Sequence, residues 1–72
     1  MMPLRRVASH WLVLPNSQRL SKMVVEIRSG RVEQYYPLNG EKAQTEWLSG
    51  SILLKEDTEG RWLAYYEGKR LE

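Results

Sequence analysis

The stretch Lys22-Met-Val-Val-Glu-Ile-Arg-Ser-Gly-Arg-Val-Glu-Gln-Tyr-Tyr36 decides the fold. Apolar and polar residues alternate before Ser29-Gly30, which is typical of a strand that buries one face. A glycine at the second position of a two-residue loop favours a type I′ turn, because this turn needs positive φ. We therefore predict a β-hairpin with strands Lys22–Arg28 and Arg31–Tyr36.

The short loop also predicts the register of this hairpin. It sets three pairs directly opposite each other, with apolar side chains kept on one face: Ile27 and Val32, Val25 and Gln34, and Met23 and Tyr36. The same register sets Glu26 opposite Glu33 and Arg28 opposite Arg31. Like charges directly opposite each other are unfavourable, and only the diagonal neighbours relieve them here.

Glycine recurs at positions 30, 40, 50 and 60, with a short β-favouring run in most of the intervals. Further strands are expected at Val7–Leu14, Ser51–Lys55 and Arg61–Tyr66, and Thr45–Leu48, ended by Ser49-Gly50, is expected to be a short strand or a bridge. Short strands at this regular spacing predict a small all-β sandwich or barrel, and no segment has sustained helical periodicity. We expect one domain over residues 1–72, a β-sandwich or partly open barrel. It would contain five to six mostly antiparallel strands built from hairpins, with little or no helix.

A second hairpin is expected around the polar turn at residues 56–60. Pairing Lys55 with Arg61 places Leu54 opposite Trp62 and Ile52 opposite Ala64, which again collects one apolar face.

The ends of the chain are expected to contribute little to the fold. Residues 1–6 are predicted to be loosely ordered, and Leu71-Glu72 has the form of a cloning scar. The apolar run after Arg5-Arg6 is interrupted by Ser9 and His10 and is interpreted as a first strand, not as a signal peptide. No run approaches the length of a membrane helix. A cytoplasmic location without membrane association is therefore expected.

The aromatic composition is unusual. Three Trp and four Tyr occur without Phe, so every aromatic side chain carries a polar atom. Such rings suit the half-buried surface of a small sheet. Because the chain has no cysteine, its core must be stabilised without disulfides.

Charge and residue types exclude several functions. The net charge is +2, with basic residues spread along the chain, so nucleic-acid binding is not expected to dominate. His10 is the single histidine and Asp57 the single aspartate, which leaves no pattern for a metal centre or a Ser-His-Asp site. Little room is expected for a water-excluding pocket. We therefore expect no enzymatic activity, no catalytic residues, no metal and no cofactor.

Part of the chain resembles a known family. The resemblance is carried by five short segments: Trp-Leu-Val-Leu-Pro at 11–15, Val-Val-Glu-Ile at 24–27, Gly-Arg-Val at 30–32, Pro-Leu at 37–38 and Trp-Leu-Ser-Gly-Ser-Ile at 47–52. Together they are similar to the N-terminal β-subdomain, or composite domain, of the amidohydrolase superfamily of metal-dependent hydrolases. The resemblance implies a small β-domain in a stand-alone bacterial protein.

The resemblance carries no catalytic residue with it. In amidohydrolases, a segment Pro-Gly-x-x-Asp-x-His-x-His enters the catalytic barrel and brings the first metal ligands. Here residues 48–55 contain no proline before Gly50, no aspartate and no His-x-His. The resemblance therefore implies a β-domain without the catalytic barrel.

Three functions remain open for such a domain. The first is a protein-interaction or accessory module that forms a homodimer or docks to a protein partner through an edge strand or a Trp/Tyr surface. The alternatives are a nucleic-acid-binding small barrel and a module that binds a small molecule or sugar. The candidate interaction residues are Trp11, Tyr35, Trp47, Trp62 and Tyr65.

Overall fold

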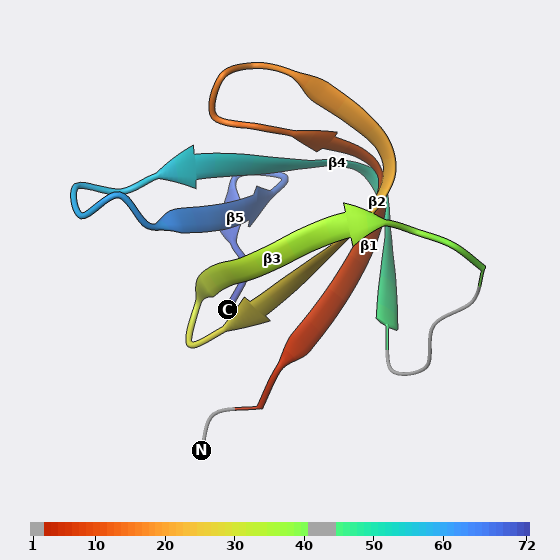
Figure 1. Cartoon of the computed structure of the whole chain (residues 1–72), viewed down its shortest axis with the longest axis horizontal. Helices are drawn as coiled ribbons and strands as arrows, with labels where there is room; N and C mark the ends of the chain where they lie inside the picture. Colours follow the sequence, from red (N-terminus) through yellow and green to blue (C-terminus); the bar gives the residue numbers. More distant parts are fainter. Residues whose placement is uncertain (1–2, 41–44) are drawn as a thin grey trace.

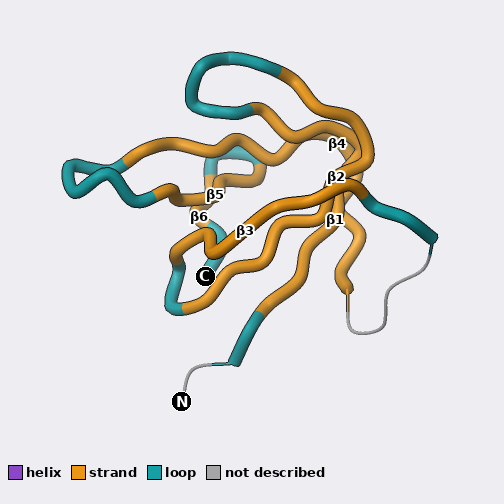
Figure 2. The backbone as a smooth tube through the Cα atoms, in the orientation of Figure 1, coloured by secondary structure: helices purple, strands orange, loops and turns teal. Residues whose placement is uncertain are grey.

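The computed structural model describes residues 3–40 and 45–72, which form one curled sheet without helix (Figures 1 and 2). The predicted all-β class and the half-open barrel are confirmed. The strands are β1 (Arg5–Val13), β2 (Arg19–Arg28), β3 (Arg31–Pro37), β4 (Thr45–Glu56), β5 (Trp62–Tyr66) and β6 (Lys69–Arg70). Because the described residues contain no helix, none of them forms a helix long and apolar enough to cross a bilayer.

The strand order is β3-β2-β1-β4-β5-β6, with β1 and β4 at the centre. Neighbouring strands are antiparallel except for the β1–β4 pair, which is parallel. The predicted preference for antiparallel pairing is therefore confirmed. The parallel pair arises because β4, although it follows β3 in the chain, joins the sheet beside β1 on the far side of β2.

The first hairpin forms as predicted at its turn. Ser29 and Gly30 both have positive φ, 54° and 74°, and Ile27 pairs with Val32. Beyond this pair the predicted register is wrong, because Glu33 forms a β-bulge. The observed pairs are Glu26 with Gln34, Val25 with Tyr35, Val24 with Tyr36 and Met23 with Pro37.

The bulge has a clear electrostatic reason. The predicted register would have set the carboxylate of Glu26 against that of Glu33, whereas the bulge sets it against the amide of Gln34. Gln34 Nε2 donates a hydrogen bond of 2.6 Å to Glu26 Oε1. A like-charge pair is thus replaced by a hydrogen bond.

The second hairpin is displaced by two residues from the predicted register. Leu54 pairs with Ala64, not with Trp62, and Glu56 pairs with Trp62. The cause is Asp57, whose Oδ1 accepts hydrogen bonds from the backbone N–H groups of Glu59 (2.8 Å) and Arg61 (2.9 Å). Because of these bonds, the strand pair that closes the turn is Glu56 with Trp62 instead of the predicted Lys55 with Arg61. Because the displacement is even, the apolar face is unchanged.

Gly50 does not end a strand, contrary to the prediction for Ser49-Gly50. It lies inside β4 with φ of 99°, where β4 has one residue more than β1: Ser9 pairs with Leu48 but Trp11 with Ser51. Such a bulge bends a strand sharply. The strand continues because β1 supports it on both sides of the bulge.

β1 and β2 bend at the same level. Along β1, Val7 and Ser9 are fully buried with the two-residue spacing of a regular strand, but the next fully buried residue is Leu12, three positions after Ser9. The alternation between the two faces is therefore displaced by one residue. Ser9 Oγ donates a hydrogen bond of 2.7 Å to the carbonyl of Trp11, and Lys22 on β2 has a positive φ of 52°. All three central strands therefore turn a corner together, and the sheet curls.

The sheet begins and ends close to the two ends of the described chain. Arg5 and Arg6 begin β1, while the expectation for residues 1–2 lies outside the described residues. Leu71 follows β6, is 8% exposed and donates its backbone N–H to the carbonyl of Ala64 at 2.8 Å. Leu71 thus packs into the core, whatever its origin.

One face of the curled sheet encloses the hydrophobic core. Its buried members are Val7, Leu12, Leu14, Met23, Val25, Ile27, Ile52, Leu54, Ala64 and Leu71. They come from β1, β2, β4 and β5 and from Leu14 and Leu71, which follow β1 and β6, and Val32 and Tyr35 of β3 pack against them. No second sheet or helix among the described residues covers this face, so the sheet must cover it by curling.

Two contacts join the far ends of the sheet. The rings of Tyr35 on β3 and Trp62 on β5 stack with centroids 5.9 Å apart and planes at 11°. Arg70 on β6 donates a hydrogen bond of 3.1 Å to the carbonyl of Gly30 in the β2–β3 turn. β3 and β5 lie close together although they are not paired in the sheet (Figure 1).

We predict that Trp62→Ala lowers the free energy of unfolding by about 3 kcal/mol, because it removes the ring that closes the barrel over the core. Urea denaturation followed by circular dichroism measures this loss. Trp47→Ala is the matched control and should change stability by no more than about 0.5 kcal/mol, since Trp47 is exposed. Equal losses in the two variants would contradict the closing role of Trp62.

Candidate functional site

Trp47 is the most exposed aromatic anchor that the structure offers. Its exposed fraction is 52%, and with Leu53 it is one of two large hydrophobic residues exposed among the described residues. Trp11 and Trp62 are instead half-buried. An exposed tryptophan is a common centre of protein interfaces, because its large ring gains much from desolvation.

Trp47 lies where β4 has an open side. Thr45–Leu48 pairs with β1, but β5 begins to pair with β4 only at Ile52. We name residues Glu46–Gly50 the β4 edge, because no strand of the described residues pairs with their other side. The edge is bounded by Tyr66, whose hydroxyl donates a hydrogen bond of 2.6 Å to the carbonyl of Ser49.

Trp47 also ends a row of side chains on the outer face, the face opposite the core. It pairs with Ala8, Ala8 pairs with Val24, and Val24 pairs with Tyr36. Ala8 and Val24 are buried at 2% and 0% exposure, although they are not part of the core. The outer face therefore has a small apolar row of its own that leads to Trp47.

The next row on this face holds a buried carboxylate. Glu26 is 5% exposed, and it accepts hydrogen bonds from Arg6 Nε (2.8 Å), Gln34 Nε2 (2.6 Å) and the hydroxyl of Tyr36 (2.7 Å). The hydrogen bonds from Gln34, Tyr36 and Arg6, in this order of effect, lower the pKa of Glu26 to about 2. Glu26 is thus charged at neutral pH, and it joins β1, β2 and β3 to one another.

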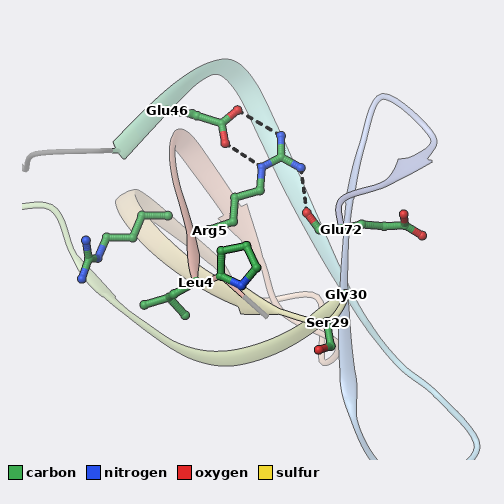
Figure 3. A pocket seen from close by; sticks show the side chains of 8 residues that line it. Leu4, Arg5, Ser29, Gly30, Glu46 and Glu72 are labelled. Atoms are coloured by element: carbon green, nitrogen blue, oxygen red, sulfur yellow. Dashed lines mark hydrogen bonds and ion pairs between the residues drawn. The ribbon is translucent and has the colours of Figure 1, made fainter. Parts of the chain in front are cut away.

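A second carboxylate is held beside Trp47. Arg5 donates two hydrogen bonds to Glu46, from Nε at 2.6 Å and from Nη2 at 3.0 Å, and a third to the backbone oxygen of Glu72 at 3.0 Å (Figure 3). The hydrogen bonds from Arg5 lower the pKa of Glu46. They fix the carboxylate of Glu46 on the strand that carries Trp47.

Arg5 also lines an open pocket of about 640 Å³ at one end of the barrel (Figure 3). Its wall includes Leu4, Gly30 and Glu46. This hollow is open to solvent, so it differs from the water-excluding pocket for which little room was expected, and it arises because the sheet curls without closing.

The remaining aromatic residues proposed from the sequence lie in three settings. Tyr35 and Trp62 stack on each other in the barrel closure. Trp11 has the guanidinium of Arg19 4.8 Å from its ring centroid. Tyr65 has the ammonium group of Lys55 at 5.1 Å. Within this set of five, Tyr35 and Trp62 form the only ring contact among the described residues.

Sequence reasoning missed a group of arginines. Arg28, Arg31 and Arg61 line an open groove of about 750 Å³ between the first hairpin and the β4–β5 turn, together with Tyr35 and Trp62. We name these five residues the arginine groove. Each arginine lies within two residues of a turn glycine, which is a visible signal. Only the closure of the barrel brings the two turns together.

His10 and Asp57, the two residues considered above for metal or Ser-His-Asp chemistry, each make a contact in the structure. The rings of His10 and Trp11 meet edge to face with centroids 5.2 Å apart. Asp57 closes the β4–β5 turn, and the hydrogen bond from the backbone of Arg61 is the main cause of its lowered pKa. Residues 3–40 and 45–72 contain no group of three His, Asp or Glu side chains that could hold a metal ion.

Comparisons with known proteins do not assign the chain to a family. No protein-family model matches the chain, and no match was found among curated proteins or among solved structures. The resemblance to the amidohydrolase β-subdomain stays a prediction.

We predict that Glu26→Gln lowers the free energy of unfolding at pH 7 by about 2 kcal/mol, because Arg6 loses its ionic partner and the charge-assisted hydrogen bonds become neutral. Since the pKa of Glu26 in the folded protein lies below its ordinary value of 4.5, its contribution is present above pH 4.5 and is lost as the pH falls toward 2. Urea denaturation between pH 7 and pH 2 measures both effects.

Glu33→Gln is the control for this prediction, because the side chain of Glu33 is 46% exposed and its ion pair with Arg28 spans 3.7 Å. It should change stability by no more than about 0.5 kcal/mol. The stability of Glu26→Gln should depend less steeply on pH than that of the wild type. An unchanged slope would show that Glu26 is not the stabilising carboxylate.

Proposed function

We propose that this protein is a non-catalytic interaction module that self-associates through the β4 edge, with Trp47 as its anchor. The observation that carries the proposal is that Trp47 is 52% exposed on a strand segment whose other side meets no described strand. An edge strand provides hydrogen-bonding groups for a further strand, and an exposed tryptophan provides the apolar contact. Neither feature alone would define an interface.

The edge is suited to a second copy of itself. Antiparallel pairing about a two-fold axis through Trp47 sets the two Trp47 rings beside each other and places Glu46 opposite Leu48 of the second copy. No like-charged residues then face each other directly. The short apolar row that ends at Trp47 would continue across the axis.

The charge on this edge is already compensated. A carboxylate on an open strand normally discourages strand addition, because it repels a second copy and loses solvation on pairing. Here Arg5 holds both carboxylate oxygens of Glu46 within the same chain, at 2.6 and 3.0 Å. This ion pair supports self-association by removing the main electrostatic obstacle.

Two further features support the rest of the proposal. At residues 48–55, where an amidohydrolase would enter its catalytic barrel, the chain continues in β4 and then turns back into β5. This path supports a β-domain that functions without the catalytic barrel. The segment that imitates a signal peptide is the central strand β1, and its Val7 and Leu12 belong to the core. We therefore propose a cytoplasmic location.

The dimer should be weak, because one short strand pair buries less than the roughly 1,200 Å² of a stable interface. We expect sedimentation velocity between 10 µM and 1 mM, about the range of weak complexes, to show a concentration-dependent shift from monomer to dimer. Trp47→Lys should abolish this shift at every concentration, because it removes the anchor and brings two like charges to the axis. Far-ultraviolet circular dichroism verifies that the variant is folded.

Leu53→Lys is the matched control. Leu53 is also exposed, at 38%, and lies on the outer face of the same strand. Unlike Trp47, it is paired with both neighbouring strands, β1 and β5. This variant should dimerise like the wild type. A wild-type protein that stays monomeric up to the highest concentration would refute self-association, and equal loss in both variants would place the contact elsewhere on β4.

A further inference from the structure

The arginine groove differs from the β4 edge in place and in chemistry. It lies between the β2–β3 turn and the β4–β5 turn, where the two hairpins approach each other. Its volume of about 750 Å³ falls within the range of small-molecule sites, about 300–1,000 Å³. Nothing in the proposed self-association uses it.

The guanidinium groups of the groove are poorly satisfied within the chain. Arg31 has no hydrogen bond or ion pair from its side chain to the described residues, and its influence on Asp57 is a longer-range attraction. The ion pairs of Arg28 with Glu33 and of Arg61 with Glu59 span 3.7 and 3.8 Å, beyond hydrogen-bonding distance. Arg28 Nε is buried without an acceptor, so this atom is not accessible to a ligand. The guanidinium groups of Arg31 and Arg61 are exposed and have no carboxylate at hydrogen-bonding distance among the described residues, so they can donate charge-assisted hydrogen bonds to an anion in the groove.

The surroundings of the groove limit the size of this anion. Glu33 lies beside Arg28, and Glu59 lies beside Arg61, so acidic groups flank the arginines. A polyanion that extends past the groove would meet these carboxylates. A compact anionic group would contact the arginines and avoid most of this repulsion.

The aromatic pair supplies a second kind of contact. Tyr35 and Trp62 both line the groove and are half-buried. Their stack fixes both rings in nearly parallel planes, 11° apart. A planar group can pack against such a preorganised surface at little entropic cost.

We propose that the arginine groove binds a compact ligand that joins a phosphate group to a planar ring, with the size and chemistry of a nucleoside monophosphate. Arg31 and Arg61 bind the phosphate, and the ring packs against the Tyr35–Trp62 pair. The acidic flanks exclude longer nucleic acids.

The test uses isothermal titration calorimetry of the whole protein with AMP, adenosine, inorganic phosphate and a twelve-residue thymidine oligonucleotide. AMP should bind more tightly than either of its parts, because only AMP engages both the arginines and the ring pair. In parallel, the indole N–H resonance of Trp62, assigned through Trp62→Phe, should shift on addition of AMP.

Arg31→Gln and Arg61→Gln should each weaken AMP binding by about tenfold, the effect of losing one charge-assisted hydrogen bond. Arg19→Gln is the matched control: it makes the same charge change at an arginine that lies over Trp11, and it should bind AMP like the wild type. Trp47→Lys should also bind AMP normally, so this test and the self-association test fail independently.

Three results would overturn the proposal. Absence of AMP binding would show that the arginine groove is not such a binding site. Equal affinity for AMP and inorganic phosphate would show that the Tyr35–Trp62 pair does not contribute to binding. Tighter binding of the oligonucleotide than of AMP would show that the flanking carboxylates do not limit the ligand. If Arg19→Gln weakened AMP binding as much as Arg31→Gln and Arg61→Gln, the loss of affinity would come from the change in net charge and not from the groove.

Discussion

The whole structure depends on the need of a single sheet to bury one of its own faces. The core contains side chains from β1, β2, β4 and β5 and from Leu71, and no helix or second sheet of the described residues packs over it. A flat sheet would leave this face in water, so the sheet has to curl. The bulge at Gly50 and the corner in β1 and β2 allow the bend, and the Tyr35–Trp62 stack holds its two ends together.

The same constraint produces the surfaces on which function is proposed. Because β4 bends at Gly50, its two halves meet different neighbours: the second half pairs with β5, whereas the β4 edge does not. Trp47 lies on the half that β5 does not pair. Because the barrel closes only through side chains, the two hairpin turns approach each other without pairing, and the arginine groove stays open between them. The interaction site and the ligand site are thus both consequences of incomplete closure.

Glu26 shows how one polar residue can select a register. Burying a carboxylate is costly unless its oxygens are satisfied, and here three side chains from β1 and β3 satisfy them. The bulge at Glu33 is what brings Gln34 opposite Glu26. A ladder without the bulge would have kept the apolar pairing and placed two carboxylates together. The polar network on the outer face therefore decides the pairing that the apolar pattern alone leaves open.

The sequence by itself determined the fold class, the β2–β3 turn, the Ile27–Val32 pair, the core face of β2 and the apolar face of the second hairpin. These features depend on local turn chemistry and on alternation, which are visible within a few residues. Trp47 could be named as a candidate from the sequence, but so could four other aromatic residues with nothing to separate them. Only the tertiary structure decided that Tyr35 and Trp62 stack on each other while Trp47 stays exposed. It also decided the bulges at Glu33 and Gly50, the parallel β1–β4 pair and the meeting of Arg28, Arg31 and Arg61. The physical reason is that these features arise from contacts between distant strands, whose geometry is set by the curl of the whole sheet.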